Sequence, residues 1–322
     1  MKALHGAAWL AHMLHDSMAA RVLLEESLAI ARALPDHRTE AWVLHVLGRV
    51  AYFDGNQASA RAFGEQSLAI AESLADPWLI GYSLHLLGLA AHIAGDYATA
   101  DQFYERSLAI RQSIGSREQI GVLYQLMGTS RQRQGDFARA RTLYHEYLAI
   151  GRELGSTFHV NQVLGLLGSL AAVQGQPERA ARLIGAAAVF HETSHTRAIP
   201  LTEALFAEGI ELARPALGEG AFARAWAAGG AMSSEEAIAE ALAVEIAPGA
   251  PAARPQRHPA GLTDAEVEVL RRLASGLKTR EIGAELVIAV STVDRHITHI
   301  YDKIGGRGRA AATTFALKHA LL

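Results

Sequence analysis

The sequence lacks several features that would point to particular classes of protein. None of its 322 residues is a cysteine, which excludes disulfide bonds and thiolate metal sites. No G-x-x-x-x-G-K-[S/T] segment is present, so a P-loop nucleotide switch is excluded in this chain. No apolar run is long enough to span a membrane, and the N-terminal stretch that resembles a signal peptide is interrupted by His5 and His12. We therefore expect a cytoplasmic protein that makes no contact with membranes.

Proline is scarce, and its distribution marks a boundary. Of the nine prolines, Pro248, Pro251, Pro255 and Pro259 fall within a short stretch that is rich in alanine. Such segments are semi-extended. We therefore predict a linker over residues 246–259 between two domains, and the chain is long enough to give each a core.

Positive charge is also in short supply. The formal net charge is −3, from 30 lysines and arginines against 33 aspartates and glutamates. Residues 1–245 carry nineteen basic against twenty-six acidic side chains, whereas residues 260–322 carry nine against seven. The small basic excess of the chain therefore lies in its C-terminal region.

What the sequence does contain is a repeat with a period of forty residues. SLAI begins at Ser27, Ser67 and Ser107, and YLAI begins at Tyr147. Each unit reads as two helices whose small residues let the two backbones approach closely. Three ladders of small residues keep the same step, and their members are Gly55, Gly95, Gly135 and Gly175 at a turn; Gly48, Gly88, Gly128 and Gly168; and Ala20, Ala60, Ala100, Ala140 and Ala180.

These units resemble the tetratricopeptide repeat with a few residues added. The match rests on the Leu-Gly pair of the first helix, as in Leu47 and Gly48, and on the alanine and aromatic residue of the second, as in Ala100 and Tyr104. The usual tryptophan is absent, and Gly64 replaces the aromatic residue in one unit. The resemblance implies an all-α helical solenoid with a groove that binds a protein segment or a small effector.

We expect the solenoid to occupy residues 1–190, with four full or nearly full helix pairs after a partial first unit. A helical extension over residues 191–245 follows, with its helices between Leu201 and Ala243. Because the first helix is truncated at Met1 and a solenoid needs a capping unit, we expect the chain to be the C-terminal portion of a longer regulator or a shortened relative.

The last sixty residues read as a compact helix-turn-helix unit. One helix begins at a Thr263 cap, with Glu266 three residues later in the arrangement of a capping box, and ends at Gly276. A later helix leaves a polar outer side, because its apolar residues recur at helical spacing and form one seam: Val293, Ile297, Ile300 and Ile304.

This segment resembles a LuxR-type (GerE-type) DNA-binding domain. The resemblance implies a four-helix domain over residues 260–322, with Thr279–Leu286 as the supporting helix and a recognition helix that ends near Ile304. The final helix, Ala310–Leu321, is the one that such domains often use to dimerise. The residues that match the family pattern in register are Leu262, Thr263, Glu266, Val269, Leu270, Leu273, Ala274, Gly276, Glu281, Ile282, Leu286, Thr292, Val293, His296, Ile300, Lys303, Gly305, Arg309 and Ala312.

The resemblance also implies which residues contact DNA. Arg295 and Thr298 are candidates for base contacts, and Asp294 would orient Arg295 or accept from cytosine. Arg280, Lys303, Arg307 and Arg309 are candidates for phosphate contacts. The full set of expected DNA-binding residues is Thr279, Arg280, Ser291, Thr292, Asp294, Arg295, His296, Thr298, His299, Lys303, Arg307 and Arg309.

Three positions depart from the family pattern. Lys278 and Ala289 stand where a serine or threonine usually caps the supporting and recognition helices, and a lost cap costs about 0.5–2 kcal/mol. Asp294 stands where a lysine is common. Ser291 followed by Asp294 would form a replacement capping box and start the recognition helix slightly later.

One motif points to an enzyme. The segment HETSH, His191 to His195, fits the zinc-protease pattern HExxH, with Glu211 at a plausible distance for a third ligand. Thr193 and Ser194 are poor helix formers, however, and the pattern requires a helix. We therefore predict no metal site, no catalytic residues and no cofactor.

Other histidines and the tryptophans fit the repeat scaffold. His45 and His85 occupy equivalent repeat positions, and we interpret them as groove-lining or partly buried structural residues. Trp42, Trp78 and Trp226 are interpreted as core or groove packing.

The whole arrangement resembles the C-terminal half of the large ATP-binding LuxR regulators. It implies a bacterial transcriptional regulator in which the repeats bind a protein or small effector and control promoter binding by the C-terminal domain. The expected partners are double-stranded promoter DNA, a second copy of the chain on that DNA, and RNA polymerase. The alternative is a protein-interaction adaptor whose terminal domain has lost DNA binding, which Ala289, Asp294 and the missing nucleotide switch suggest.

Overall fold

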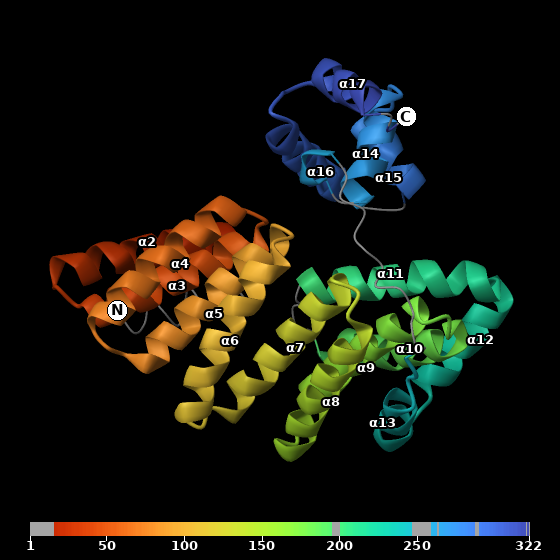
Figure 1. Ribbon diagram of the computed structural model, residues 1–322, viewed down its shortest axis with the longest axis horizontal. Coiled ribbons are helices and arrows are strands. Elements are labelled where there is room, and N and C mark those ends of the chain that lie inside the picture. The colour runs from red at the N-terminus through yellow and green to blue at the C-terminus, as the bar shows by residue number, and fades with distance from the viewer. Residues whose placement is uncertain are drawn as a thin grey trace. The chain divides into compact units, whose positions relative to one another are not determined.

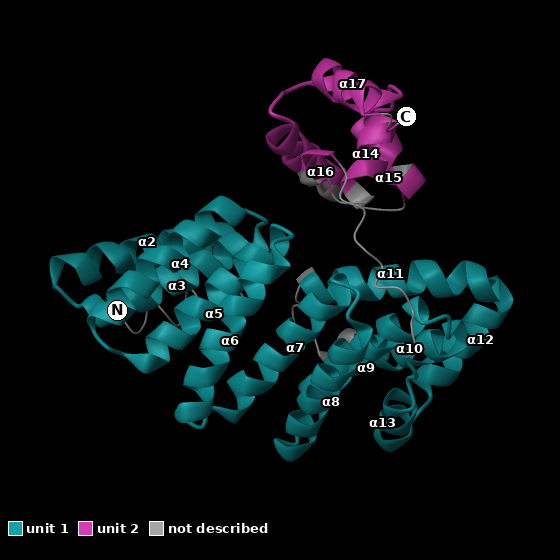
Figure 2. Ribbon diagram, in the orientation of Figure 1, with its two compact units in different colours: residues 1–252 teal, residues 253–322 magenta. Residues whose placement is uncertain are grey.

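The computed structural model describes residues 16–194, 200–246, 259–262, 264–286, 290–319 and 321. Every regular element within these ranges is a helix, which confirms the all-α fold class. The chain forms two compact units, residues 1–252 and 253–322 (Figure 2). The division between the units falls among the closely spaced prolines.

The helices of the repeat array follow one another at a constant step. Each helix from α2 to α9 has 17 residues and begins 20 residues after the one before it (Figure 1). The array comprises α2 (Ser17–Ala33), α3 (His37–Phe53), α4 (Gln57–Ser73), α5 (Pro77–Ile93), α6 (Tyr97–Ser113), α7 (Arg117–Arg133), α8 (Phe137–Glu153), α9 (Thr157–Val173) and α10 (Pro177–Ser194).

A shared turn produces this step. The N-cap side chains of Asp36, Asn56 and Asp96 each accept a hydrogen bond from the backbone N–H three residues later, which satisfies a donor that the helix leaves unpaired. The predicted turn glycines adopt the left-handed conformation, with φ of 74° at Gly55, 77° at Gly95, 77° at Gly135 and 71° at Gly175. Gly115 and Gly155 adopt it too, so the turn recurs every half unit, which the sequence analysis did not predict.

The second glycine ladder lies where helices approach most closely. A Cβ atom on Gly88 would lie 2.3 Å from Cε1 of Tyr104, and one on Gly128 would lie 2.5 Å from Cε1 of Tyr144. Both tyrosines are fully buried, as is the alanine ladder from Ala20 to Ala180. The prediction that small residues permit close packing within each pair is confirmed.

Three helices extend the array: α11 (Pro200–Leu217), α12 (Glu219–Gly230) and α13 (Ser234–Leu242). Helix α11 crosses the earlier helices. Glu208 on it pairs with Arg133 of α7 at 2.6 Å, and Phe206 fills the space over Gly165 of α9, where a Cβ atom would lie 2.2 Å from its ring. The extension therefore covers part of the face that the sequence analysis assigned to a partner.

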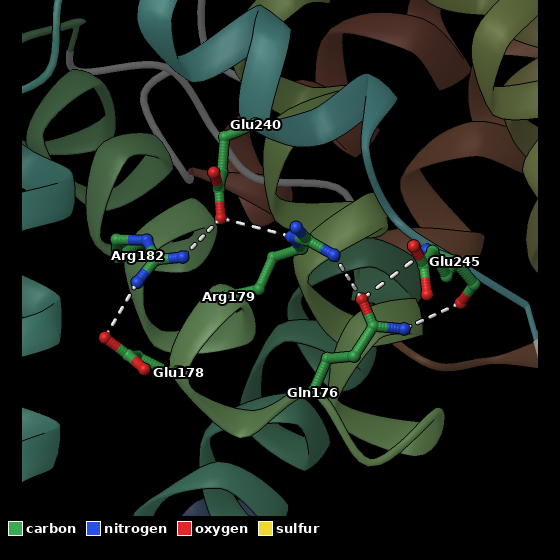
Figure 3. Close-up of polar contacts among 6 residues, drawn as sticks. All are labelled: Gln176, Glu178, Arg179, Arg182, Glu240 and Glu245. Atoms are coloured by element: carbon green, nitrogen blue, oxygen red, sulfur yellow. Dashed lines mark hydrogen bonds and ion pairs between the residues drawn. The ribbon is translucent and has the colours of Figure 1, made fainter.

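A polar network fastens α13 to α10. Arg179 and Arg182 of α10 both donate to Oε1 of Glu240 on α13 (Figure 3). The Gln176 amide donates to the carbonyl oxygen of Glu245 at 2.7 Å and accepts from the backbone N–H of the same residue at 3.4 Å. These contacts hold Glu240 and Glu245 against α10 and the turn before it.

The second unit is a four-helix domain, as predicted. It begins with a short 3-10 helix, η1 (Pro259–Gly261), and continues with α14 (Asp264–Ala274), α15 (Thr279–Leu286), α16 (Val290–Ile304) and α17 (Arg309–Lys318). The supporting helix has the predicted bounds. The final helix ends at Lys318, three residues short of the prediction, because His319 provides its C-cap.

Two features concern the function classes raised by the sequence. Helix α10 ends at Ser194, and His195, the last residue of HETSH, lies outside the described residues. Among the residues that the structure describes, no group of three or more His, Cys, Asp or Glu side chains is placed to hold a metal ion. None of the described helices is long and apolar enough to cross a membrane.

Candidate nucleic-acid interface

The core of the C-terminal unit orients α16. Val293 and Ile300 are fully buried among residues of α14, α15 and α17, and Ile297 and Ile304 pack against the same core. The predicted seam is confirmed. Because this side of the helix faces the core, the opposite side faces outward, and Asp294, Thr298 and Asp302 are exposed there.

Helix α15 begins without the usual side-chain cap and uses another device. Lys278 stands at the cap position, and Glu281 accepts from its backbone N–H at 2.7 Å. This bond supplies one half of a capping box. One backbone donor at the start of the helix is therefore satisfied, although Lys278 stands where a serine or threonine usually caps it. The Lys278 side chain itself is exposed beside Thr279 and Arg280.

Helix α16 begins at Val290, earlier than the replacement cap would allow. Ser291 therefore lies inside the first turn, and the prediction that it caps the helix is wrong. Ala289 precedes the helix but lies outside the described residues.

The outer side of α16 carries several of the predicted DNA-binding residues. The Thr298 hydroxyl donates to the carbonyl oxygen of Asp294 at 3.0 Å, which leaves its oxygen lone pairs facing solvent. His296 is partly exposed. Ser291, Thr292 and Arg295 belong to the helix, but their side chains are outside the described set.

Two predicted residues of α16 also serve the domain core. Nζ of Lys303 lies 2.7 Å from a carboxylate oxygen of Glu266 on α14, and Nδ1 of His299 lies 4.0 Å from the other oxygen. The Glu266 side chain is only 5% exposed. The carboxylate that the sequence assigned to a cap at Thr263 therefore joins α14 to α16, and Thr263 itself is outside the described residues.

Arg309 links the final helix to the turn before α15. Its guanidinium donates to the carbonyl oxygens of Gly276, at 2.7 Å, and Leu277. Arg307 and Arg280 are exposed. Of the four predicted phosphate contacts, Arg280, Arg307 and Arg309 are exposed, and Lys303 and Arg309 also bind neighbouring elements.

Lys278 is a residue that the sequence analysis considered only as a lost cap. Its exposed ammonium group stands at the N-terminus of α15, next to the exposed Arg280. The signal that could have identified it is a positive charge in the turn that enters the supporting helix, where helix N-termini attract phosphate.

Comparison with known families agrees with this geometry. Residues 260–316 match the family described as bacterial regulatory proteins, luxR family, and residues 2–73 and 81–114 match tetratricopeptide repeat families. The C-terminal unit is a LuxR-family helix-turn-helix domain. The matched residues of the N-terminal unit are tetratricopeptide repeats, and α7 to α10 continue the same 20-residue step.

Relatives of the LuxR-domain chain include the Mycobacterium tuberculosis protein named "Putative HTH-type transcriptional regulator Rv0890c", which is 35% identical over 124 residues. That match covers 38% of this chain and 14% of the relative. Transcriptional regulatory protein YdfI of Bacillus subtilis is 39% identical over 67 residues, or 21% of this chain and 32% of YdfI. The chain therefore spans a small part of the length of these curated relatives.

Among solved structures, BtubC (BKLC) from P. vanneervenii is similar to this chain. It is 21% identical, with a TM-score of 0.49, and the match covers 70% of this chain and 92% of BtubC.

Proposed function

We propose that the protein is a DNA-binding transcriptional regulator in the cytoplasm, and that its repeat array controls promoter binding by its LuxR domain in response to a protein or small effector. The match of residues 260–316 to the LuxR family carries this proposal. The names of relatives, which describe transcriptional regulators, support it. The repeat array supports the sensing role, because stacked helix pairs provide an extended binding surface.

Helix α16 is the recognition helix in this proposal. Its buried seam fixes the outward direction of Asp294 and Thr298, and Arg295 follows Asp294 on the same helix. A helix of this kind enters the major groove, where side chains contact base edges. Thr279, Ser291, Thr292, His296 and His299 complete the proposed contact set.

Binding as a pair is the second part of the proposal. The basic excess of residues 260–322 is small, and a single domain with few phosphate contacts binds DNA weakly. Leu317 of α17 is 65% exposed, and we propose that it lies in the surface through which two copies pair. RNA polymerase is the further partner that a promoter-bound regulator would contact.

Selection of bound sequences from a random DNA pool tests the proposal with the full chain at moderate salt. We expect enrichment of a site with two related half-sites, and weaker binding as salt rises, because bound phosphates release counterions. A pool that shows no enrichment would leave the protein-interaction adaptor as the better interpretation.

A further inference from the structure

Helix α11 covers one face of α9, in the last full repeat. On the equivalent face of α3 and α5, in the first two full repeats, the residues are unusual. Phe206 of α11 packs on Gly165 of α9, and the Cβ of Gly209 would lie 3.0 Å from Cα of Ser169. The forty-residue period places His45 and His85 at positions equivalent to Gly165, and Arg49 at a position equivalent to Ser169. The same surface is therefore small and covered by α11 in α9, whereas α3 and α5 carry large side chains there, and the charge is that of Arg49 on α3.

Aromatic rings surround these positions. The rings of Trp42 and Trp78 lie 4.8 Å apart, those of Trp78 and Tyr82 lie 4.4 Å apart, and Trp42 also stacks on His45 at 5.2 Å. We call Trp42, His45, Trp78 and Tyr82 the aromatic cluster. Trp78 is 37% exposed, and Trp42 and Tyr82 are partly exposed. A flat ring from solvent could therefore stack on the aromatic cluster.

Arg111 of α6 lies beneath the cluster and departs from the repeat pattern. The equivalent positions forty and eighty residues earlier and forty residues later hold small buried residues, namely Ala71, Ala31 and Gly151. Gly81 makes room for Arg111, because a Cβ atom there would lie 2.9 Å from its Nε. The Tyr82 ring covers the guanidinium carbon at 3.9 Å.

The Arg111 charge has no counter-ion among the described residues. The side chain is 1% exposed, its two terminal nitrogens donate no hydrogen bond there, and no carboxylate of the described chain forms an ion pair with it. Burial of a charge without a partner is costly, which makes an arginine at a small-residue position unfavourable for stability alone. This residue is therefore better explained by a ligand.

The neighbouring titratable groups leave the surroundings positive. Burial, then the nearby charges of Arg49 and Arg111, lower the pKa of His85 to about 3. Burial and the same two arginines also hold the pKa of His45 well below its usual range. Both histidines are neutral near pH 7, and the arginines provide the charge. At the rim, Asp76 is engaged by Arg38 at 2.8 Å and caps α5.

We propose that the first two repeats bind a small ligand in which a flat ring carries a carboxylate or phosphate group. The ring stacks on Trp42 and Trp78, and the anionic group pairs with Arg111 after the Tyr82 ring, which covers the guanidinium, turns aside. Arginine binds both anions through paired N–H donors. The inference rests on the proposed function, because it gives the chemical class of the effector that the repeats would bind.

Binding can be measured on the full chain without DNA, by calorimetry and tryptophan fluorescence. The probes are benzoate, indole-3-acetate and phenyl phosphate, each compared with its neutral counterpart benzamide, indole-3-acetamide or phenol. We expect at least one anion to bind saturably and about tenfold or more tightly than its neutral counterpart. The carboxylate and phosphate arms show which anion the site prefers.

The variant Arg111→Ala separates a ligand site from a structural residue. It restores the alanine of equivalent positions, so we expect an increase in Tm of the unliganded protein and a loss of affinity of about tenfold or more. Arg106→Ala on the same helix is the control, because Arg106 is 55% exposed and pairs with Glu72. The proposal is overturned if no anion outbinds its neutral counterpart, or if Arg111→Ala lowers Tm and leaves affinity unchanged. Because no DNA is present, these outcomes are independent of the DNA selection.

Discussion

Gly88 shows how tightly single residues constrain the helix pairs. An added methyl group would lie 2.3 Å from the ring of the buried Tyr104, so the ring or the helix must move. We expect Gly88→Ala to lower the free energy of unfolding by about 1–3 kcal/mol, although alanine favours a helix. Chemical denaturation monitored by circular dichroism measures this change.

A glycine with space around it is the matched control. Gly220 lies in α12, and its added methyl would meet only Nη1 of Arg224, at 3.6 Å. Gly220→Ala should leave the protein unchanged or stabilise it by up to about 1 kcal/mol through helix propensity. Equal effects of the two substitutions would contradict the role assigned to Gly88.

Arg295 is the residue on which the proposed base recognition depends. Replacement by alanine should relax sequence preference at one base pair of the half-site and cost about 1–3 kcal/mol of specific binding. Competition between selected and altered DNA sites measures both quantities. The exposed Arg280 provides the contrast, because Arg280→Ala should weaken all sites alike. If Arg295→Ala binds every site with unchanged preference, another residue reads the base.

The sequence predicted positions of single residues well where a local pattern specified them. The glycines of the forty-residue ladder and the seam from Val293 to Ile304 are where their spacing placed them. The partner of Glu266 could not be predicted, because its ion pair with Lys303 spans 37 positions and forms only when α14 and α16 pack. The capping box predicted for Thr263 and Glu266 stays a prediction, because Thr263 lies outside the described residues.

At the scale of elements, one carboxylate joins α13 to α10. Burial raises the pKa of Glu240, but hydrogen bonds from Arg182 and Arg179 outweigh it and place the pKa below its ordinary value (Figure 3). The stability from this group is therefore complete above the ordinary glutamate pKa and is lost as the pH falls through the lower folded value. We expect Glu240→Gln to cost about 1 kcal/mol near pH 7, and less at acidic pH, where the carboxylate is protonated anyway.

Hydrogen exchange of α13 measures this effect at the element concerned. Amide protection in α13 should fall in Glu240→Gln, while protection in α3 to α6 stays the same. Glu235→Gln is the control, because its side chain is 79% exposed and lies 3.8 Å from Arg152. Loss of protection in the control as large as in Glu240→Gln would show that the charge of α13, and not this contact, holds the helix.

The sequence predicts some helices and their packing but not others, and the reason is physical. The pairs of the array and helix α15 follow from local spacing, caps and turns, and α15 has the predicted limits. The predicted boundary of the repeats at residue 190 falls within α10, which continues to Ser194. The course of α11 across α7 and α9 does not follow from its own sequence, because Phe206 and Glu208 are ordinary residues of an amphipathic helix until Gly165 and Arg133 meet them. Arg49 of α3 and His85 of α5, which share this register, stay partly exposed. The groove could therefore be predicted from the repeats, but not that α11 covers only one end of it.

At the scale of the whole molecule, two units of opposite charge share one chain. Residues 1–245 are acidic in balance and residues 260–322 slightly basic, so the repeats add nothing to the attraction for DNA. Affinity must then come from the LuxR domain, and two copies on neighbouring half-sites would double its contacts. The composition of the sequence already indicated this balance, whereas it could not indicate which apolar residue of α17 remains uncovered.

Pairing through α17 gives the last prediction. Leu317→Ala removes the large apolar side chain that is 65% exposed on α17, so the fold of the domain should keep its Tm. Binding to DNA with two half-sites should weaken about tenfold or more and lose its cooperativity, while binding to a single half-site stays the same. Electrophoretic mobility shifts with both DNAs measure this difference. Leu212→Ala, at a leucine that is 49% exposed on α11 of the repeat unit, is the matched control and should bind both DNAs like the unaltered protein. An equal loss on the single half-site would mean that Leu317 supports DNA contact within one domain, and pairing would then have to use another surface.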